Sequence, residues 1–131
     1  MQTVLLISAG GVLGVLSRYG LVTLMTVVLG NPAPAQGGFP WGTLLVNLLG
    51  CLLVGLLAGW LEGRDVLREE VRLALVVGVL GGFTTFSSFA LEALQLLSHR
   101  GAGLAAAYVL ASVAGGMAMA GAGLLYMRPT G

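Results

Sequence analysis

The stretch Gly81-Gly82-Phe83-Thr84-Thr85-Phe86-Ser87-Ser88-Phe89 interrupts a long apolar run that otherwise has the length and composition of one transmembrane helix. Adjacent glycines and β-branched threonines lower the helix propensity of this stretch. A break in a membrane helix frees backbone groups that lipid cannot pair, so it is tolerated only where it is buried in protein or lines a polar cavity. The sequence therefore predicts a broken helix with a polar site near the middle of the bilayer.

The composition predicts a membrane protein. Hydrophobic residues make up 57% of the 131 residues and charged residues only 8%, whereas an average soluble domain has roughly 25% charged residues. The formal net charge of +1 gives no electrostatic reason to expect a nucleic-acid partner. We expect one all-α domain over residues 1–131, embedded in the cell membrane as a multi-pass protein.

Four apolar segments are long enough to cross the hydrocarbon core. We predict helices at about residues 4–29, 41–61, 71–97 and 102–126, with the break inside the third. The residues from Gly30 to Pro40 contain three prolines and three glycines, which predicts a loop. The charged run from Glu62 to Arg72 reads as a solvated turn that leads into the third helix.

Small residues on the first and fourth segments indicate close helix contacts. In the first segment the small face is formed by Gly10, Gly11 and Gly14. In the fourth it is formed by Ala111, Gly115, Gly116 and Gly123. Small residues let the backbones of membrane helices approach one another. We therefore expect tight packing along both faces.

Polar side chains inside the spans each have two interpretations. Asn47 shares a helix face with Thr43, and it either forms an interhelical hydrogen bond or lines a polar path. Tyr108 and Ser112 share a face of the fourth segment, as packing groups or as part of such a path. Arg18 is either an interfacial anchor or a functional residue.

The residue types around the break favour an anion. An anion needs hydrogen-bond donors, whereas a cation needs carbonyls or carboxylates. The polar side chains expected to face inward are rich in hydroxyls and amides and poor in acids. Glu92, one turn after Phe89, is expected near the mouth of a pore. Aromatic ring edges carry partial positive charge and so suit an anion as well. Carbonyls freed by the break would suit a cation, or threonine hydroxyls would satisfy them without any ion. The residues alone do not fix the ion.

Three other functions account for the sequence less well. A proton-coupled drug exporter would need an embedded carboxylate, and Glu92 is the one candidate. A non-transporting assembly subunit would explain the glycine and alanine faces but not the hydroxyl and phenylalanine cluster. No nucleophile–base pair or metal-ligand set indicates an enzyme.

The segment at 81–89 closely resembles the signature of the Fluc (CrcB) family of fluoride channels. The resemblance extends to Gly-Val-Leu-Ser-Arg-Tyr at 14–19 and to Gly-Thr-Leu-Leu-Val-Asn-Leu-Leu-Gly at 42–50. Tyr108 and Ser112 also match, as does the number of spans. Ser88 stands where the family pattern has a threonine, but it keeps a hydroxyl.

The resemblance implies an antiparallel, dual-topology homodimer with two pores that passively lets fluoride leave the cytoplasm. Phe86 and Phe89 would meet fluoride with their ring edges, and Asn47 would be an amide donor. The polar track would be completed by Thr43, Ser88, Tyr108 and Ser112.

The resemblance also implies a structural sodium ion and two residues near the ends of the path. The backbone carbonyls of Gly81 and Thr84 from both subunits would hold the sodium at the dimer axis. Arg18 would match the arginine of the family's first helix. Glu92 would lie at a vestibule.

The distribution of arginines opposes a dual topology. Arg64, Arg68, Arg72 and Arg128 are expected on the side of the N-terminus, whereas Arg100 falls clearly on the other. The positive-inside rule then favours an N-terminus in the cytoplasm. Dimer packing is the competing influence, so the two orientations stay open.

Overall fold

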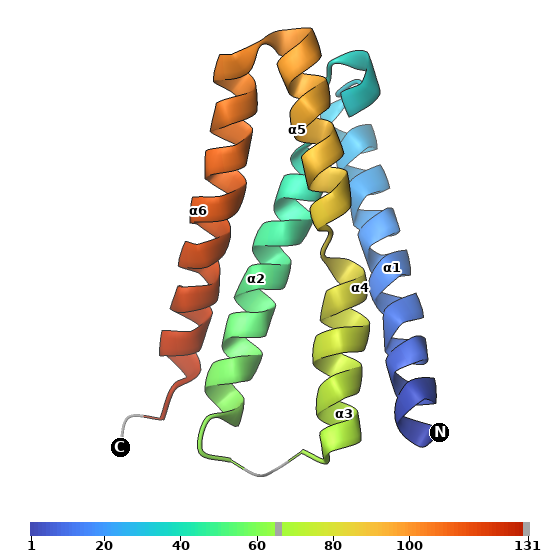
Figure 1. The fold of residues 1–131 in the computed structure, drawn as a ribbon, viewed down its shortest axis with the longest axis vertical. Helices are drawn as coiled ribbons and strands as arrows, with labels where there is room; N and C mark the ends of the chain where they lie inside the picture. The colour runs from blue at the N-terminus through green and yellow to red at the C-terminus, as the bar shows by residue number, and fades with distance from the viewer. Residues whose placement is uncertain (65–66, 130–131) are drawn as a thin grey trace.

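The computed structural model describes residues 1–64 and 67–129, and the regular structure in this part of the chain is helical. Four helical segments are long and apolar enough to cross a membrane, which confirms the prediction of an all-helical, multi-pass membrane protein (Figure 1). The elements in order are α1 (Gln2–Leu29), the 3-10 turn η1 (Pro34–Gln36), α2 (Trp41–Leu61), α3 (Glu69–Leu73), the π-helical segment η2 (Ala74–Leu80), α4 (Gly81–Phe83), α5 (Phe86–Arg100) and α6 (Ala102–Met127).

The third span is broken where the sequence predicts it. It consists of α3, η2, α4 and α5, and the helical path stops between Phe83 and Phe86 (Figure 1). Thr84 has φ −81° and ψ 159°, and Thr85 has φ −151° and ψ 125°, so both residues are extended. The break therefore falls on the two adjacent β-branched residues that follow the glycine pair.

The third span is longer at both ends than the predicted range of 71–97. At its start Glu69 and Arg72 form an exposed ion pair at 2.9 Å, so this part of the predicted turn is helical. At its end the helix continues to Arg100 and stops at Gly101, which has φ 87°. Acidic residues in a first turn and basic residues in a last turn favour the helix dipole. Asp65 and Val66, also in the predicted turn, lie outside the described residues.

Glycines join α1 to the third span backbone to backbone. Gly78 and Gly82 of the third span face Gly10 and Gly14 of α1. A Cβ added to Gly82 would lie 2.7 Å from the Gly11 carbonyl oxygen, and one added to Gly10 would lie 2.6 Å from that of Ala74. No larger residue fits such an approach without a shift of the backbone, so the glycine face predicted on the first segment is confirmed for Gly10 and Gly14, whereas a Cβ at Gly11 would meet nothing within 4 Å.

Glycines also join α2 to α6. A Cβ added to Gly123 would lie 2.6 Å from the Leu52 carbonyl oxygen, and one added to Gly59 would overlap the Leu124 carbonyl. Gly116 lies against Cys51, whose Sγ would be 3.1 Å from an added Cβ. The predicted small face of the fourth segment is therefore used against α2.

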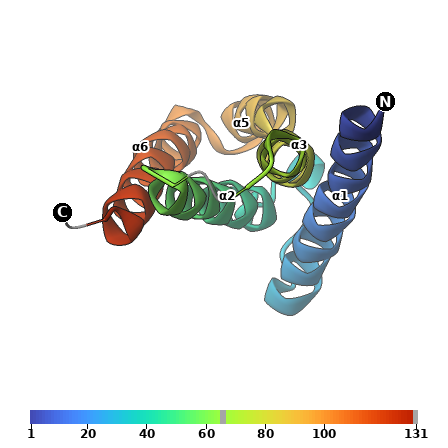
Figure 2. The same ribbon diagram turned by 90° about the horizontal axis from the view of Figure 1, so that it is seen from below.

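The two helix pairs that pack through glycines are α1 with the third span and α2 with α6. The space between α2 and the third span is called the wedge. Seen from below, α1 and α6 lie on opposite sides of the bundle, with α2 and the third span between them (Figure 2). Two cavities, of about 380 and 650 Å³, follow the line between α2 and the third span. The N-terminus, the end of α2, the start of α3 and the C-terminal end share one end of the bundle (Figure 1).

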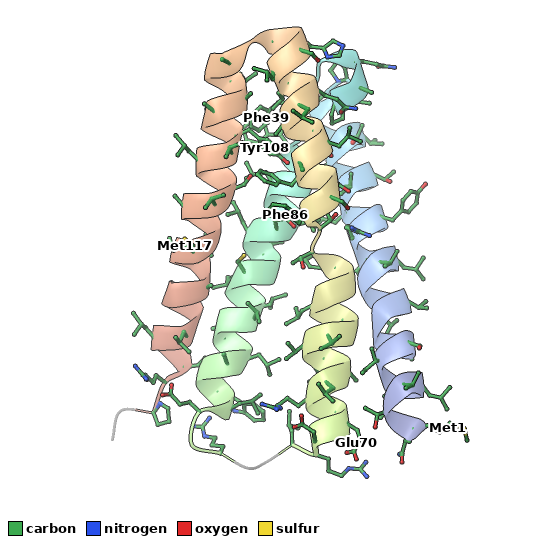
Figure 3. The ribbon with its side chains drawn as sticks, in the orientation of Figure 1. Met1, Phe39, Glu70, Phe86, Tyr108 and Met117 are labelled. Atoms are coloured by element: carbon green, nitrogen blue, oxygen red, sulfur yellow. The ribbon has the colours of Figure 1, made fainter. Side chains whose placement is uncertain are left out.

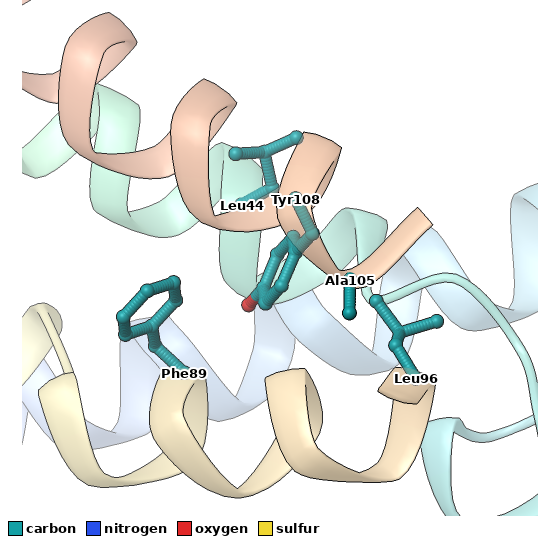
Figure 4. Close-up of a cluster of buried hydrophobic side chains, with 5 residues drawn as sticks. All are labelled: Leu44, Phe89, Leu96, Ala105 and Tyr108. Carbon is teal, nitrogen blue, oxygen red and sulfur yellow. The ribbon is translucent and has the colours of Figure 1, made fainter. Parts of the chain in front are cut away.

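Charged contacts and the apolar core lie at different levels of the bundle. At the end that holds both termini, Arg128 pairs with Glu62 at 2.6 Å. Hydrogen bonding to this carboxylate raises the pKa of the Arg128 guanidinium above its usual range. The buried core is in the other half, and it consists of Leu44, Phe89, Leu96, Ala105 and Tyr108 (Figure 4).

Candidate functional site

The side chain of Asn47 on α2 spans the wedge to the broken helix. Its Oδ1 accepts a hydrogen bond from the Thr85 amide at 2.9 Å, and its Nδ2 donates to the Thr85 carbonyl at 3.0 Å. The interhelical hydrogen-bond interpretation of Asn47 is therefore confirmed. A carboxamide nitrogen has two N–H donors, so one remains beyond the bond to Thr85. Its role in an ion path stays a prediction.

Two backbone carbonyls at the break are deprived of their usual partners. In a continuous α-helix the Gly81 carbonyl would accept from the Thr85 amide, and the Thr84 carbonyl from the Ser88 amide. Instead the Thr85 amide donates to Asn47, and the Ser88 amide donates to Thr85 Oγ1 at 3.3 Å. Gly81 and Thr84 are the residues whose carbonyls the family resemblance implies for sodium.

The threonine hydroxyls stabilise the break without satisfying those two carbonyls. Thr84 Oγ1 donates to the Leu80 carbonyl at 2.9 Å, on the side of α4. Thr85 is the N-cap of α5, and its Oγ1 donates to Ser88 Oγ at 3.1 Å. A threonine cap satisfies one of the free amides of a helix start. The Leu80 carbonyl also keeps its helical partner, the Thr84 amide at 3.0 Å, so the Thr84 hydroxyl replaces no lost bond there. Among the described residues neither threonine hydroxyl donates to the Gly81 or Thr84 carbonyl.

Side chains from three spans surround the 380 Å³ pocket beside the break. Phe86 is 78% exposed and Phe89 is 8% exposed, and their ring centroids lie 5.5 Å apart. The Ser112 hydroxyl oxygen is buried and has no hydrogen-bond partner among the described residues. The polar and aromatic lining consists of Asn47, Gly81, Thr84, Thr85, Phe86, Phe89 and Ser112.

A second polar cluster lies beyond Phe89. Glu92 accepts hydrogen bonds from Thr43 Oγ1 at 2.8 Å and from the Tyr108 hydroxyl at 2.9 Å. Tyr108 is fully buried and Thr43 is 3% exposed. The Phe89 and Tyr108 rings, whose centroids are 5.4 Å apart, connect this cluster to the pocket (Figure 4). Both Glu92 oxygens accept hydrogen bonds from hydroxyls, so the embedded carboxylate that an exporter would use is engaged within the protein.

Two predicted residues lie at the edge of this arrangement. Ser88 does not line the pocket and reaches it through Thr85. Arg18 is half-buried on α1 and does not line the pocket either. Figure 3 shows Phe39 and Tyr108 in the half of the bundle opposite Met1 and Glu70, with Phe86 near the break.

Three features of this site were not predicted from the sequence. Glu92 was expected near a mouth without its two hydroxyl partners, and no role was predicted for Phe39, whose ring packs edge-on against Tyr108 at 5.6 Å. The π-helical turn Ala74–Leu80 was also not foreseen. The spacing of Glu92 four residues before Leu96 and three after Phe89 placed it on the core face, and that was the available signal for its partners.

A broken span with polar groups gathered around it, inside a bundle of four apolar spans, defines a multi-pass membrane protein with a site at mid-span. The chain belongs to the CrcB family, because the model described as "CrcB-like protein, Camphor Resistance (CrcB)" matches residues 5–124.

Three relatives that carry the name of a fluoride channel match 92% or more of this chain. A protein of Methylobacterium nodulans named "Fluoride-specific ion channel FluC" is 47% identical over 131 residues, which is 100% of both chains. Its namesake in Rhizobium meliloti is 44% identical over 128 residues, or 98% of both chains. The one in Thermus thermophilus is 49% identical over 121 residues, which is 92% of this chain and 90% of that protein. All three carry the name of an ion channel rather than of an enzyme, in agreement with the expectation of no enzymatic activity.

Proposed function

We propose that this protein is a fluoride-selective channel through which fluoride passively leaves the cytoplasm. The observation that carries the proposal is the pocket beside the break in a member of the CrcB family. There an amide donor on α2, a buried hydroxyl on α6 without a partner among the described residues, and two phenylalanine rings on α5 gather around one space. The names of the three relatives identify fluoride as the ion.

The chemistry of the pocket suits a small anion that must lose water. Asn47 retains one N–H donor, and the Ser112 hydroxyl has a hydrogen to donate. The ring edges of Phe86 and Phe89 add partial positive charge without a mobile cation. Together these groups replace part of the hydration shell of fluoride while presenting no carboxylate within the pocket lining. Thr43, Ser88 and Tyr108 extend the polar route beyond it.

A second copy of the chain completes the site in this proposal. The pocket opens out of the wedge, and Phe86 is exposed beside unpaired polar groups. Lipid offers no partner for such groups at mid-span, whereas a second subunit does. A two-fold axis in the membrane plane at the break would bring the breaks of the two subunits together. It would produce an antiparallel homodimer with two equivalent pores.

The residues at the break fit a sodium ion on that axis. The Gly81 and Thr84 carbonyls have lost the amide partners of a continuous helix, and both line the pocket. Two subunits would bring four carbonyl oxygens to one point, the type of ligand that a monovalent cation prefers. A bound sodium ion would supply positive charge beside the anion route and would hold the two breaks together.

The ends of the route are assigned to charged residues. Glu92, held by Thr43 and Tyr108, lies toward the end of the bundle that contains Arg100. Its fixed hydrogen bonds keep both carboxylate oxygens turned to hydroxyl donors rather than to the passing anion. Arg18, half-buried on α1 and outside the pocket lining, would add positive charge at longer range.

Efflux from liposomes tests the function directly. Vesicles loaded with potassium fluoride or potassium chloride and carrying the purified protein are assayed with an ion-selective electrode after valinomycin is added. We expect rapid fluoride release and retention of chloride. Equal release of the two anions would refute the selectivity, and retention of both would refute the channel.

A further inference from the structure

One face of α5 carries a row of polar side chains that starts at the helix break. Ser88, Glu92 and Gln95 are spaced i, i+4 and i+7, which places them on one side of an α-helix. Ser88 Oγ accepts a hydrogen bond from Thr85 Oγ1 at 3.1 Å, so the row is connected to the break. Gln95 ends this row, and the proposed function leaves it without a role.

A groove of about 240 Å³ follows the row between α5 and η1. The α5 wall contains Ser88, Glu92 and Gln95, and the opposite wall is formed by residues 33–35, Ala-Pro-Ala. The opposite wall has no polar side chain, so the side-chain hydrogen-bonding groups of the groove come from α5. Glu92 also lines a cavity of about 40 Å³ together with Thr43. Glu92 is therefore a residue that the groove shares with the polar cluster beyond Phe89.

The Gln95 carboxamide is free to meet a ligand. Gln95 is half-buried, and its backbone carbonyl, not its side chain, accepts from the Ser98 hydroxyl at 3.0 Å. Within residues 1–64 and 67–129 no hydrogen bond uses the carboxamide. A carboxamide offers two N–H donors without a charge. Such donors can hold a small anion that still carries part of its water, without trapping it.

We propose that the groove between η1 and α5 is an outer mouth of the anion path and that Gln95 is the outermost residue that contacts the anion there. The inference rests on the proposed fluoride channel. A fluoride ion entering the groove would meet the Gln95 amide first and Ser88 last. It would pass Glu92 on the side away from the two hydroxyls that hold the carboxylate. A glutamine that is merely solvated near a helix end is the alternative.

Charge placed at Gln95 distinguishes these two roles. In a Cys51→Ser background, Gln95→Cys is modified with either of two methanethiosulfonate reagents of similar size, one ending in a sulfonate and one in a trimethylammonium group. The negative adduct should reduce fluoride efflux several-fold relative to the positive adduct. This difference should shrink at high salt, because the Debye length falls from roughly 30 Å at 0.01 M to roughly 3 Å at 1 M.

Two further positions serve as matched comparisons in the same background. Leu94→Cys is the adjacent residue, 63% exposed and outside the groove lining, so the sign of its adduct should not matter. Ala33→Cys lies on the opposite wall and should reproduce the charge effect. Mass spectrometry measures modification at each position.

The outcomes distinguish a failure of the proposed mouth from a failure of the proposed channel function. Equal effects of the two reagents at Gln95→Cys, or a failure of both to reach it, would overturn the mouth. A charge effect of the same size at Leu94→Cys would overturn it as well. No release from the wild type would instead overturn the proposed function, and the unmodified Gln95→Cys protein gives the starting rate against which each adduct is compared.

Discussion

Asn47 and Thr85 are joined by a pair of hydrogen bonds in which the side chain of one residue replaces the helical partners of the other's backbone. The bonds measure 3.0 and 2.9 Å and connect α2 to the break between α4 and α5. The break is thereby held in an extended conformation at a fixed distance from α2. The same pair diverts the Thr85 amide from Gly81, so one side chain both stabilises the break and leaves a carbonyl free.

Asn47→Leu should destabilise the protein and stop fluoride efflux. The substitution leaves the Thr85 amide and carbonyl without partners, and a part-buried unsatisfied group costs about 1–3 kcal/mol. Asn47→Asp keeps an acceptor for the Thr85 amide but adds negative charge beside the pocket, so it should stop efflux with less loss of stability. Thermal unfolding in detergent and liposome efflux are the measurements.

A second asparagine provides the control for that experiment. Asn31 Nδ2 donates to the Phe39 carbonyl at 2.6 Å, outside the 380 Å³ pocket, so Asn31→Ala also removes a bond from a side chain to the backbone. It should leave most of the efflux intact. Wild-type efflux in Asn47→Asp would show that Asn47 only supports the break.

Gly82→Ala should weaken the contact between α1 and the third span. Its Cβ would lie 2.7 Å from the Gly11 carbonyl oxygen, and overpacking of this kind costs about 1–3 kcal/mol. Gly11→Ala is the matched control, because a Cβ at Gly11 meets nothing within 4 Å. Thermal unfolding should show a lower midpoint for the first variant alone. Equal midpoints for the two variants would contradict the packing described here.

How far the sequence predicts this protein depends on the range over which each residue acts. The break could be predicted because Thr84 and Thr85 disfavour a helix locally. Lipid cannot pair the backbone groups that a break frees, so polar residues at such a position in an apolar span indicate a site. The four spans and the glycine face of α1 follow from the same local rules. The third span extends past its predicted ends because Glu69 and Arg100 are polar yet favourable at helix termini.

Partners across helices could not be predicted in the same way. Nothing within Asn47 or Glu92 specifies that the first binds the Thr85 backbone and that the second joins Thr43 to Tyr108. These contacts depend on how the spans rotate against one another, which is set by glycine packing at other levels of the bundle. Gln95 was overlooked for a related reason, since η1 forms the other wall of its groove.

Tyr108→Phe should reduce fluoride efflux while preserving the core. The change removes the hydroxyl that donates to Glu92 at 2.9 Å and keeps the ring against Phe89 and Phe39. Glu92 then loses one of its two hydroxyl donors, and its carboxylate is freer to oppose an anion. Tyr126→Phe, at an 82% exposed tyrosine, is the control for efflux. Equal efflux from both variants would mean that the Tyr108 hydroxyl is only a packing group.

Chains in both membrane orientations are expected if the dimer is antiparallel. The structure places the N-terminus at the end where α2 stops and α3 starts, with Arg64 and Arg72, and places Arg100 at the other end (Figure 1). The asymmetry would favour a cytoplasmic N-terminus. Labelling of Gln2→Cys, in a Cys51→Ser background, with a membrane-impermeant reagent in intact cells measures the orientation. Labelling of about half the molecules, relative to lysed cells, supports two orientations, whereas none or all would exclude an antiparallel dimer.

Replacement of sodium should loosen the dimer and slow fluoride efflux together. The Gly81 and Thr84 carbonyls lack their helical amides because Asn47 and Thr85 take those amides, and Thr84 uses its hydroxyl on Leu80 instead of on either carbonyl. Four such oxygens brought together by a two-fold axis would repel one another unless a cation lies between them. A large organic cation such as N-methyl-D-glucamine cannot enter that space. Size exclusion should therefore show a smaller dimer fraction in its salts than in sodium salts, and efflux should fall with it. Restoring sodium should reverse both changes. The Gly11→Ala variant, whose added Cβ would meet nothing within 4 Å, should keep the same sodium dependence. A dimer fraction and an efflux rate that are both indifferent to sodium would show that donors from the protein or water satisfy the carbonyls.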